Sequence, residues 1–126
     1  MTNKSIASIL SKKFRFKING SLWIECEAEG FFGPGRTELL QRVEQTGSIN
    51  KAAKEMGMSY KKAWEMINEL NTRATKPLVI TQAGGKQGGG SMITDEAKSL
   101  IDFYQQLRKR FTAFLEKETK HIIKSS

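Results

Sequence analysis

Hydrophobic and polar positions change their period several times along the chain. The stretch FRFKI, residues 14–18, alternates apolar and basic side chains, which indicates a half-buried strand. Asn19-Gly20 follows, and this dipeptide favours a two-residue hairpin turn because both residues tolerate positive φ. The pattern predicts a β-hairpin over residues 13–26, preceded by a loose arm or a short helix over residues 1–12.

The period of a helix takes over after the turn-forming segment GFFGPGR. Apolar side chains recur at spacings of three and four, which predicts three helices at 36–46, 48–56 and 60–73. Gly47 and Gly57 end the first two helices, because glycine readily takes up the backbone conformation that follows a helix. Together these helices form a predicted three-helix core over residues 36–73.

The last third of the chain predicts a β-ribbon and a long helix. Short apolar runs flank a glycine-rich segment, which predicts paired strands over residues 78–93. Thr94 is a candidate N-cap, and a long helix is expected over 95–120. Its heptad-like seam is typical of a helix that pairs with another helix. The apolar positions of this helix are Ala97, Leu100, Tyr104, Leu107, Phe111 and Phe114. We therefore predict a single domain over 1–126, mainly α with small β-hairpins (an α+β class).

The glycine-rich segment GGKQGGG, residues 84–90, admits three interpretations. The spacing fits neither a dinucleotide fingerprint nor a Walker phosphate loop. A linker is disfavoured because short apolar strands flank the segment. A hairpin tip remains, with Lys86 and Gln87 at its end; it either docks on a sugar-phosphate chain or is a turn without contacts.

Charge narrows the candidate functions. The chain has 21 Lys and Arg against 13 Asp and Glu, a formal net charge of +8, which favours attraction to polyanions, nucleic acid first and an anionic membrane surface second. Cys26 is the only cysteine, which fits a reducing cytoplasm. No apolar run is long enough to span a bilayer. The chain is therefore expected to be cytoplasmic.

Enzyme chemistry is not expected. His121 is the sole histidine and has no evident partner, and Cys26 has no histidine nearby in the sequence. Carboxylates show no spacing typical of acid–base pairs, and no zinc-ligand spacing occurs. We expect no catalytic residue, no metal and no cofactor.

The segment GSINKAAKEMGMSYKKAWEMINELN, residues 47–71, predicts a helix-turn-helix motif. Ser48 and Ser59 are candidate N-caps of the second and third helices. Small Ala52 and Ala53 allow these two helices to approach closely, and the β-ribbon after the third helix is typical of a winged helix. Trp64 either packs against the second helix or contacts DNA, and the first reading is slightly favoured. The candidate DNA-binding residues are Ser48, Ser59, Tyr60, Lys61, Lys62, Glu65, Asn68, Lys86 and Gln87.

A family resemblance rests on several motifs taken in order. FFGPGR, TGSINKAAKEMGMSYKKAW, NELN, PLVIT, GGKQGGG and MIT lie at compatible spacing. Over roughly residues 14–115 the chain resembles the N-terminal, LysR-like winged helix-turn-helix domain of ModE-type molybdate-responsive transcriptional regulators. The resemblance implies that the helix after Ser59 enters the major groove and that the ribbon is a wing with Lys86 beside the phosphates.

The resemblance also implies a homodimer built on the long helix. The predicted dimerisation residues are Leu100, Tyr104, Leu107, Phe111 and Phe114. Full-length members carry C-terminal domains that bind molybdate or tungstate, whereas this sequence ends at Ser126, so oxyanion binding by this chain is not expected. The expected partners are double-stranded DNA and a second copy of the chain, with molybdenum-related genes as targets by kinship. The alternative is a winged-helix adaptor that binds a protein without recognising a DNA sequence.

Overall fold

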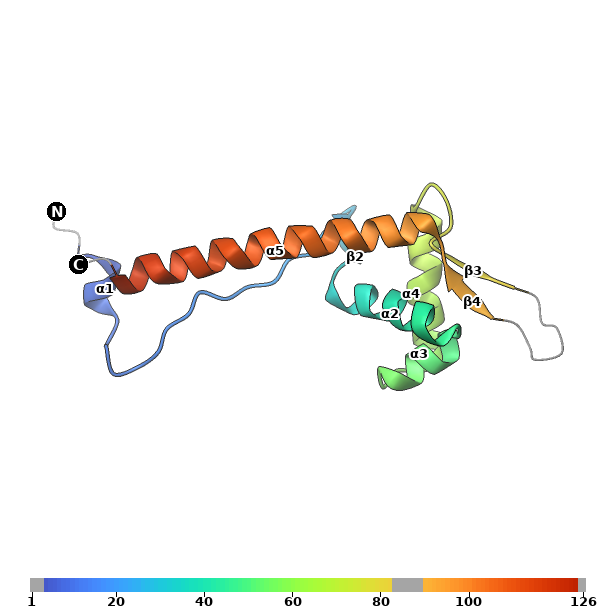
Figure 1. Cartoon of the computed structure of the whole chain (residues 1–126), viewed down its shortest axis with the longest axis horizontal. Helices are drawn as coiled ribbons and strands as arrows, with labels where there is room; N and C mark the ends of the chain where they lie inside the picture. Colours follow the sequence, from blue (N-terminus) through green and yellow to red (C-terminus); the bar gives the residue numbers. More distant parts are fainter. Residues whose placement is uncertain (1–3, 83–89, 125–126) are drawn as a thin grey trace. The chain divides into compact units, whose positions relative to one another are not determined.

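The computed structural model describes residues 4–82 and 90–124, and their contacts group the chain into two compact units. Unit 1 comprises residues 1–22 and 105–126, and unit 2 comprises residues 23–104. The sequence predicts one domain, whereas the contacts divide the chain within the long helix α5 (Asp95–Lys124). The predicted class, a mainly helical α+β fold with small antiparallel strand pairs, is confirmed (Figure 1).

Three helices of unit 2 form where the 3.6-residue period predicts them. They are α2 (Pro34–Thr46), α3 (Ile49–Glu55) and α4 (Tyr60–Arg73). Helix α2 begins earlier than predicted because Pro34 occupies its first turn, where a fixed φ fits the helix and a missing N–H costs nothing. Gly47 ends α2 with φ 70°. Helix α2 therefore starts and stops at local sequence signals.

The first hairpin lies later in the chain than predicted. Strands β1 (Ile24–Cys26) and β2 (Glu29–Phe32) pair antiparallel. Their turn is formed by Glu27 and Ala28, at φ 53° and 68°, and not by Asn19-Gly20. The prediction of a hairpin over 13–26 is therefore wrong, because side chains distant in sequence hold this region in another conformation.

Those distant partners belong to unit 1. The backbone N–H of Ile18 donates to Thr119 Oγ1 at 2.9 Å. At Gly20 an added Cβ would lie 3.3 Å from the ring of Phe111. Ile18 and Gly20 therefore contact α5, and not a second strand. Ahead of this segment lies the short helix α1 (Ile6–Ile9), in line with the expectation of an arm or a short helix.

The wing strands of unit 2 lie close to their predicted positions. Strands β3 (Val79–Thr81) and β4 (Ser91–Ile93) pair antiparallel, with Val79 opposite Ile93 and Thr81 opposite Ser91. The connecting segment 83–89, which contains Lys86 and Gln87, lies outside the described residues. Thr94 caps α5, because its Oγ1 accepts from the N–H of Ala97 at 3.2 Å.

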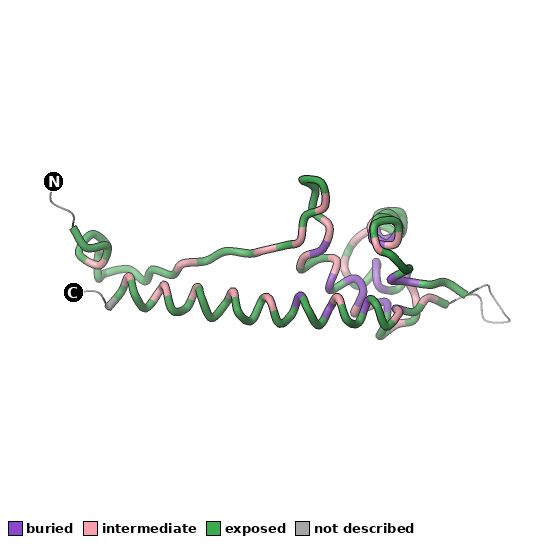
Figure 2. The backbone as a smooth tube through the Cα atoms, turned by 90° about the horizontal axis from the view of Figure 1, so that it is seen from above, coloured by how far each residue is buried: buried purple, intermediate pink, exposed green. Residues whose placement is uncertain are grey.

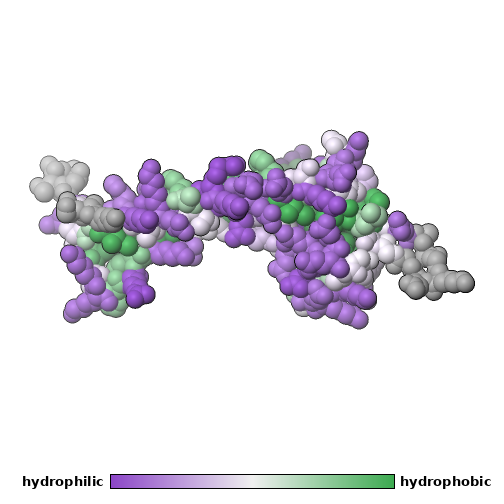
Figure 3. All heavy atoms as spheres, viewed as in Figure 1, coloured by the Kyte–Doolittle hydropathy of each residue, from purple (hydrophilic) through white to green (hydrophobic). Residues whose placement is uncertain are grey.

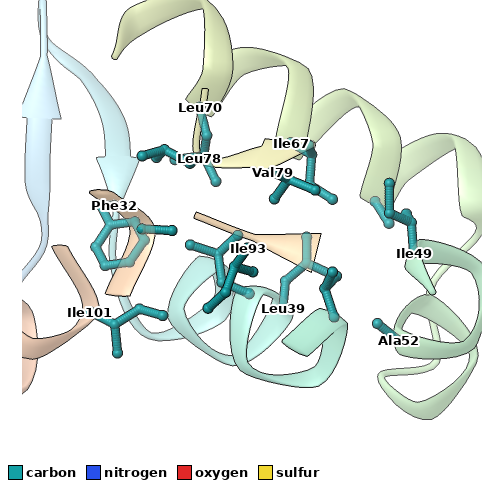
Figure 4. Packing of buried hydrophobic residues seen from close by; sticks show 14 of the residues in the cluster. Phe32, Leu39, Ile49, Ala52, Ile67, Leu70, Leu78, Val79, Ile93 and Ile101 are labelled. Carbon is teal, nitrogen blue, oxygen red and sulfur yellow. The ribbon is translucent and has the colours of Figure 1, made fainter. Parts of the chain in front are cut away.

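The hydrophobic core belongs to unit 2. Figure 4 shows Leu39, Ile67, Leu70 and Ile93 converging from α2, α4 and β4. The buried positions in Figure 2 lie in β2, in α2–α4, around the wing strands and in the first turns of α5. In unit 1, by contrast, none of the residues whose burial is described is buried. Packing therefore fixes the helix-turn-helix far more firmly than it fixes unit 1.

Candidate nucleic-acid interface

The turn between α3 and α4 has a complete set of capping bonds. The N–H of Met58 donates to the carbonyl of Ala53 at 3.0 Å, and that of Gly57 donates to Lys54 at 3.1 Å. This is the Schellman arrangement, which requires a residue such as Gly57 with its φ of 69°. Ser59 then caps α4, since its Oγ accepts from the N–H of Lys62 at 3.1 Å. The turn therefore sets the direction in which α4 leaves α3.

Ser48 plays the same part at the start of α3. Its Oγ accepts from the N–H of Lys51 at 3.1 Å. Both serine hydroxyls are thus engaged in capping their own helices, as the sequence predicts. The DNA contact predicted at Ser48 and Ser59 rests on the backbone N–H groups of the first helical turns, which favour phosphate oxygens, and it stays a prediction.

Helix α4 has a buried face and a polar face. Ala63, Ile67 and Leu70 are buried against the core. The candidate contact residues of this helix lie on the other side and are exposed: Tyr60, Lys61, Lys62, Glu65 and Asn68. The cations, carboxylate and amide can reach base edges or phosphates, because the core leaves their side chains free.

Trp64 lies on the exposed side of α4. Its side chain is 48% exposed, and that of Tyr60, one turn earlier, is 51% exposed. The slightly favoured interpretation of Trp64 as a packing residue is therefore not what the structure shows. Its indole borders the polar face of α4 and is available to a ligand. The residue that sequence reasoning set aside joins the candidate interface.

An ion pair with α2 compensates one negative charge of α4. Arg36 of α2 pairs with Glu69, and its other guanidinium nitrogen donates to the carbonyl of Phe31 at 3.0 Å. A paired carboxylate repels a phosphate less than a free one does. On the face of α4 predicted to meet DNA, the carboxylate without an ion pair among the described residues is that of Glu65. This face is more basic than its sequence indicates.

Asn71 connects α4 to the wing, a role that sequence reasoning missed. Its Oδ1 accepts from the N–H of Leu78 at 2.8 Å and of Val79 at 3.1 Å, and its Nδ2 donates to the carbonyl of Val79 at 3.0 Å. One amide thus satisfies three backbone groups of the segment entering β3. Asn71 is the second asparagine of the motif NELN, but only the fold shows what its side chain contacts.

The other wing strand is tied to the turn after α2. The N–H of Ser91 donates to the carbonyl of Gly47 at 2.9 Å. At Gly90 an added Cβ would lie 3.5 Å from the same carbonyl. Hydrogen bonds therefore join the base of the wing both to α4 and to the turn that precedes α3.

The five predicted dimerisation residues divide into two groups. Tyr104 is 1% exposed and packs edge-to-face on Phe32, with ring centroids 5.5 Å apart, and Leu100 packs against the same core. These two serve the interior of unit 2. Leu107 and Phe111 are half-buried, and Phe114 is 56% exposed. Phe103, at 52% exposed, is a further apolar side chain that the heptad reading omitted.

Ion pairs hold the remaining arginines of unit 2. Arg42 contacts Glu55 and Glu38, each at 2.8 Å, and the hydrogen bond to Glu55, then that to Glu38, raises the pKa of Arg42. Arg73 contacts Glu29 at 3.1 Å, and this hydrogen bond is the main cause that raises its pKa. Arg36, Arg42 and Arg73 are thus committed to carboxylates of the chain itself.

The residues set aside for enzyme chemistry remain scattered. Cys26 is a half-buried free thiol in β1, and His121 is exposed on α5. Within residues 4–82 and 90–124, no three His, Cys, Asp or Glu side chains gather in a way that could hold a metal ion. Across the same part of the chain, none of the helices has the length and apolar character to cross a membrane.

Known proteins resemble part of the chain. Over 87 residues the chain is 39% identical to the molybdenum transport protein ModE of Azotobacter vinelandii. These residues make up 69% of this chain and 32% of that protein. Over 86 residues it is 40% identical to the DNA-binding transcriptional dual regulator ModE of Escherichia coli K12, 68% of this chain and 33% of the relative.

The molybdenum-pterin-binding protein MopB of Rhodobacter capsulatus is 42% identical over 72 residues, 57% of this chain and 27% of the relative. The chain thus spans about a third of the length of these relatives. The family model for the bacterial regulatory helix-turn-helix proteins of the lysR family matches residues 35–98, from the first turn of α2 to the start of α5. This match covers half of the chain, including the whole helix-turn-helix and the wing strands, and the chain belongs to the lysR family of bacterial regulatory helix-turn-helix proteins.

Proposed function

We propose that this chain is a sequence-specific DNA-binding transcription regulator that acts as a homodimer. The observation that carries the proposal is the exposed polar face of α4, presented after a fully capped turn and beside an anchored wing. A helix in this position of a helix-turn-helix enters the major groove, where its first turns meet base edges. The lysR family match and the names of the relatives support the same function.

The roles of individual residues follow from where they lie. Lys61 and Lys62 would reach base edges or phosphates from the first turn of α4, and Asn68 and Glu65 would read bases from the same face. Tyr60 and Trp64 would cover sugar or base surface. Lys86 and Gln87 lie outside the described residues, and their contact with the phosphates stays a prediction.

The homodimer rests on apolar surface that the chain leaves uncovered. Phe103, Leu107 and Phe114 recur at spacings of four and seven along α5, which places them on one side of the helix. Phe103 and Phe114 are each more than half exposed. A second copy of the chain would bury this stripe, and a two-fold dimer matches an operator with two half-sites one helical turn apart.

A binding assay on the chain's own upstream DNA tests the function. Fluorescence anisotropy would compare that duplex with a shuffled duplex of equal length, and DNase footprinting would locate the protected bases. We expect preferred binding of one site containing an inverted repeat. Equal affinity for both duplexes at about 0.15 M salt, near the physiological ionic strength, would refute the proposal.

A protein-binding adaptor is the second candidate, and the exposed aromatic pair favours it. Tyr60 and Trp64 place apolar surface in the middle of the α4 face, and aromatic side chains are enriched at protein interfaces. On this reading Trp64→Ala abolishes capture of a protein partner and leaves DNA affinity unchanged. Under the DNA-binding proposal the same substitution weakens DNA binding.

The regulated genes are proposed to concern molybdenum, because the names of the relatives refer to molybdenum transport or to binding of molybdenum-pterin. A reporter fused to the bound promoter, with and without the gene for this chain, tests this. We also propose that unit 2 does not itself bind molybdate, because its arginines are paired with carboxylates. Equilibrium dialysis with molybdate checks that point.

The chain is further proposed to be a binding protein and not an enzyme, and to work in the cytoplasm, where the bacterial chromosome lies. The support is the family, whose description is that of regulatory proteins. Fractionation of cells into cytoplasm, periplasm and membrane, followed by immunodetection, tests the location.

A further inference from the structure

The net positive charge of this protein lies almost wholly outside the helix-turn-helix unit. Unit 1 contains eleven Lys and Arg against two Glu, a formal charge of +9. Unit 2 contains ten Lys and Arg against eleven Asp and Glu, a formal charge of −1. The basic composition that points to nucleic acid therefore belongs to residues 1–22 and 105–126.

The two units also differ in how their cations are compensated. Every ion pair between described residues lies in unit 2, where Arg36, Arg42, Arg73 and Lys98 have carboxylate partners. In unit 1, no described basic side chain forms an ion pair. All ten of these side chains are exposed: Lys4, Lys12, Lys13, Arg15, Lys17, Arg108, Lys109, Arg110, Lys117 and Lys120. The charge of unit 1 is open to a ligand.

Four of these cations form a stripe on α5. Lys109, Arg110 and Lys117 lie three or four residues from the exposed Ala113, and Lys120 lies three residues beyond Lys117. These spacings place the four cations on one side of the helix. Eleven residues of helix separate the ends of the stripe, about 17 Å at 1.5 Å per residue. Figure 3 shows hydrophilic side chains over much of the visible face along α5. We call these four residues the basic stripe.

The N-terminal segment places more cations beside the helix. The charged residues that line a groove in unit 1 are Arg15 and Lys17 of the segment and Arg108, Lys120 and Glu116 of α5, four cations against one carboxylate. The bond between Ile18 and Thr119 holds the two walls together. Cations from two stretches of chain far apart in sequence thus converge on one surface.

We propose that this surface of unit 1 is a second nucleic-acid site, which binds the phosphate backbone of duplex DNA without reading its sequence. Duplex DNA carries one negative charge per about 1.7 Å of its axis, so a linear array of unpaired cations matches it. A membrane-surface helix would carry a broad apolar face beside its cations. On α5 the exposed side chains of Phe103 and Phe114 belong to the proposed dimer surface, and the basic stripe itself surrounds only Ala113. The inference rests on the proposed function in taking duplex DNA as the ligand.

The test compares two duplexes and a set of variants of the full chain by fluorescence anisotropy. The duplexes are the bound promoter fragment and a random sequence of equal length, each titrated over a range of salt. The variant Lys109→Gln/Lys117→Gln/Lys120→Gln should bind both duplexes more weakly by the same factor. Its log–log salt dependence should be shallower by about 2 to 3, at about 0.9 per lost phosphate contact. An unchanged slope on both duplexes would overturn the inference.

A second variant moves the charge in the opposite direction. Glu116→Gln/Glu118→Gln removes the two carboxylates of unit 1 and should tighten binding to both duplexes. Its matched control is Glu25→Gln/Glu27→Gln, which removes two exposed carboxylates from the β1–β2 hairpin of unit 2. A rise confined to the unit 1 variant supports the site, and equal rises in both variants would show only a general charge effect and overturn it.

Sedimentation equilibrium accompanies each variant, because unit 1 also contains part of the proposed dimer surface. If the lysine variant no longer has the wild-type mass, the Glu116→Gln/Glu118→Gln pair decides alone. If the wild type prefers no sequence, the proposed function fails while the salt slopes on random duplex still decide this inference. Co-sedimentation with phosphatidylserine vesicles is the remaining measurement. Vesicle binding lost in the lysine variant, together with unchanged DNA binding, would assign the surface to a membrane and refute the DNA site.

Discussion

The helix-turn-helix of unit 2 and the cationic surface of unit 1 stand in contrast in both packing and charge. Unit 2 closes its helices over Leu39, Leu40 and Leu70, which expose no surface, whereas unit 1 buries none of the residues whose burial is described. Unit 2 pairs its arginines with carboxylates, whereas the basic side chains of unit 1 that the structure describes form no ion pair. Stability is thus concentrated in the part proposed to read sequence, and free charge in the part proposed to hold the backbone.

This contrast bears on what a regulator needs from each surface. Reading bases requires side chains held in one geometry, because hydrogen bonds to base edges are directional. Attraction to phosphates requires charge but little precise geometry, because it is long-ranged and follows counterion release. A firm core under α4 and a thinly packed, cationic unit 1 satisfy these two requirements separately.

The largest expected loss of stability comes from a cavity in the core of unit 2. Leu40→Ala removes a side chain with 0% exposure and should lower the free energy of unfolding by about 3 kcal/mol, the usual cost of a buried cavity. In unit 1, Leu115→Ala removes a half-buried side chain and should cost about 1 kcal/mol. Urea denaturation followed by circular dichroism measures both. Equal losses would contradict the difference in packing.

A smaller effect is expected where α4 meets the wing. Asn71→Ala leaves the N–H groups of Leu78 and Val79 without their acceptor and should cost about 2 kcal/mol of stability. Its control is Asn68→Ala, one turn earlier on α4, where the side chain is exposed and the change should stay within about 0.5 kcal/mol. Thermal unfolding of the two variants compares them. If Asn68→Ala were the more damaging to stability, the anchor would be wrongly placed.

Substitutions in α4 and at the wing tip are expected to affect DNA binding differently. Lys61→Ala should relax sequence preference by about 1.5 kcal/mol, since a base contact is lost. Lys86→Ala should weaken binding to operator and random duplex alike, because it removes a phosphate contact. Competition binding with both duplexes measures each ratio. Identical behaviour of the two variants would remove the distinction between base-reading and backbone-holding lysines.

The smallest effect compares two serine caps. Ser59→Ala removes the cap of the 14-residue α4 and should cost about 1 kcal/mol. Ser5→Ala removes the cap of the four-residue α1 in unit 1 and should cost no more than a few tenths. Chemical denaturation resolves the pair. A larger cost at Ser5 would indicate that α1 is packed more firmly than the described contacts show.

Local signals predicted most of unit 2 from the sequence. Ser48 and Ser59 cap the helices that they were expected to cap, and Gly47 and Gly57 end the helices before them. These signals succeed because each depends on residues within one turn of chain. The exposure of Lys61, Lys62, Glu65 and Asn68 follows in the same way from the 3.6-residue period. How these residues contact DNA stays a prediction.

Distant contacts decided the rest. Asn19-Gly20 has the composition of a hairpin turn, yet the turn falls at Glu27 and Ala28, because Ile18 and Gly20 contact α5 at Thr119 and Phe111. The alternation over residues 14–18 does not mark a buried strand face, since Phe14 is 68% exposed and Phe16 is 36% exposed. The heptad spacing likewise placed Tyr104 in a dimer seam, whereas in the structure its ring packs on Phe32.

Sequence alone thus determined the helices, their caps, the wing strands and the family resemblance, since these are set by neighbours along the chain. Tertiary structure decided which cations are free. The composition reports a net charge of +8 without a location, while the ion pairs Arg36–Glu69, Arg42–Glu55 and Arg73–Glu29 join residues 13 to 44 positions apart. Charge compensation depends on the distance in space between two side chains. The tertiary structure determines that distance, and the order of residues does not.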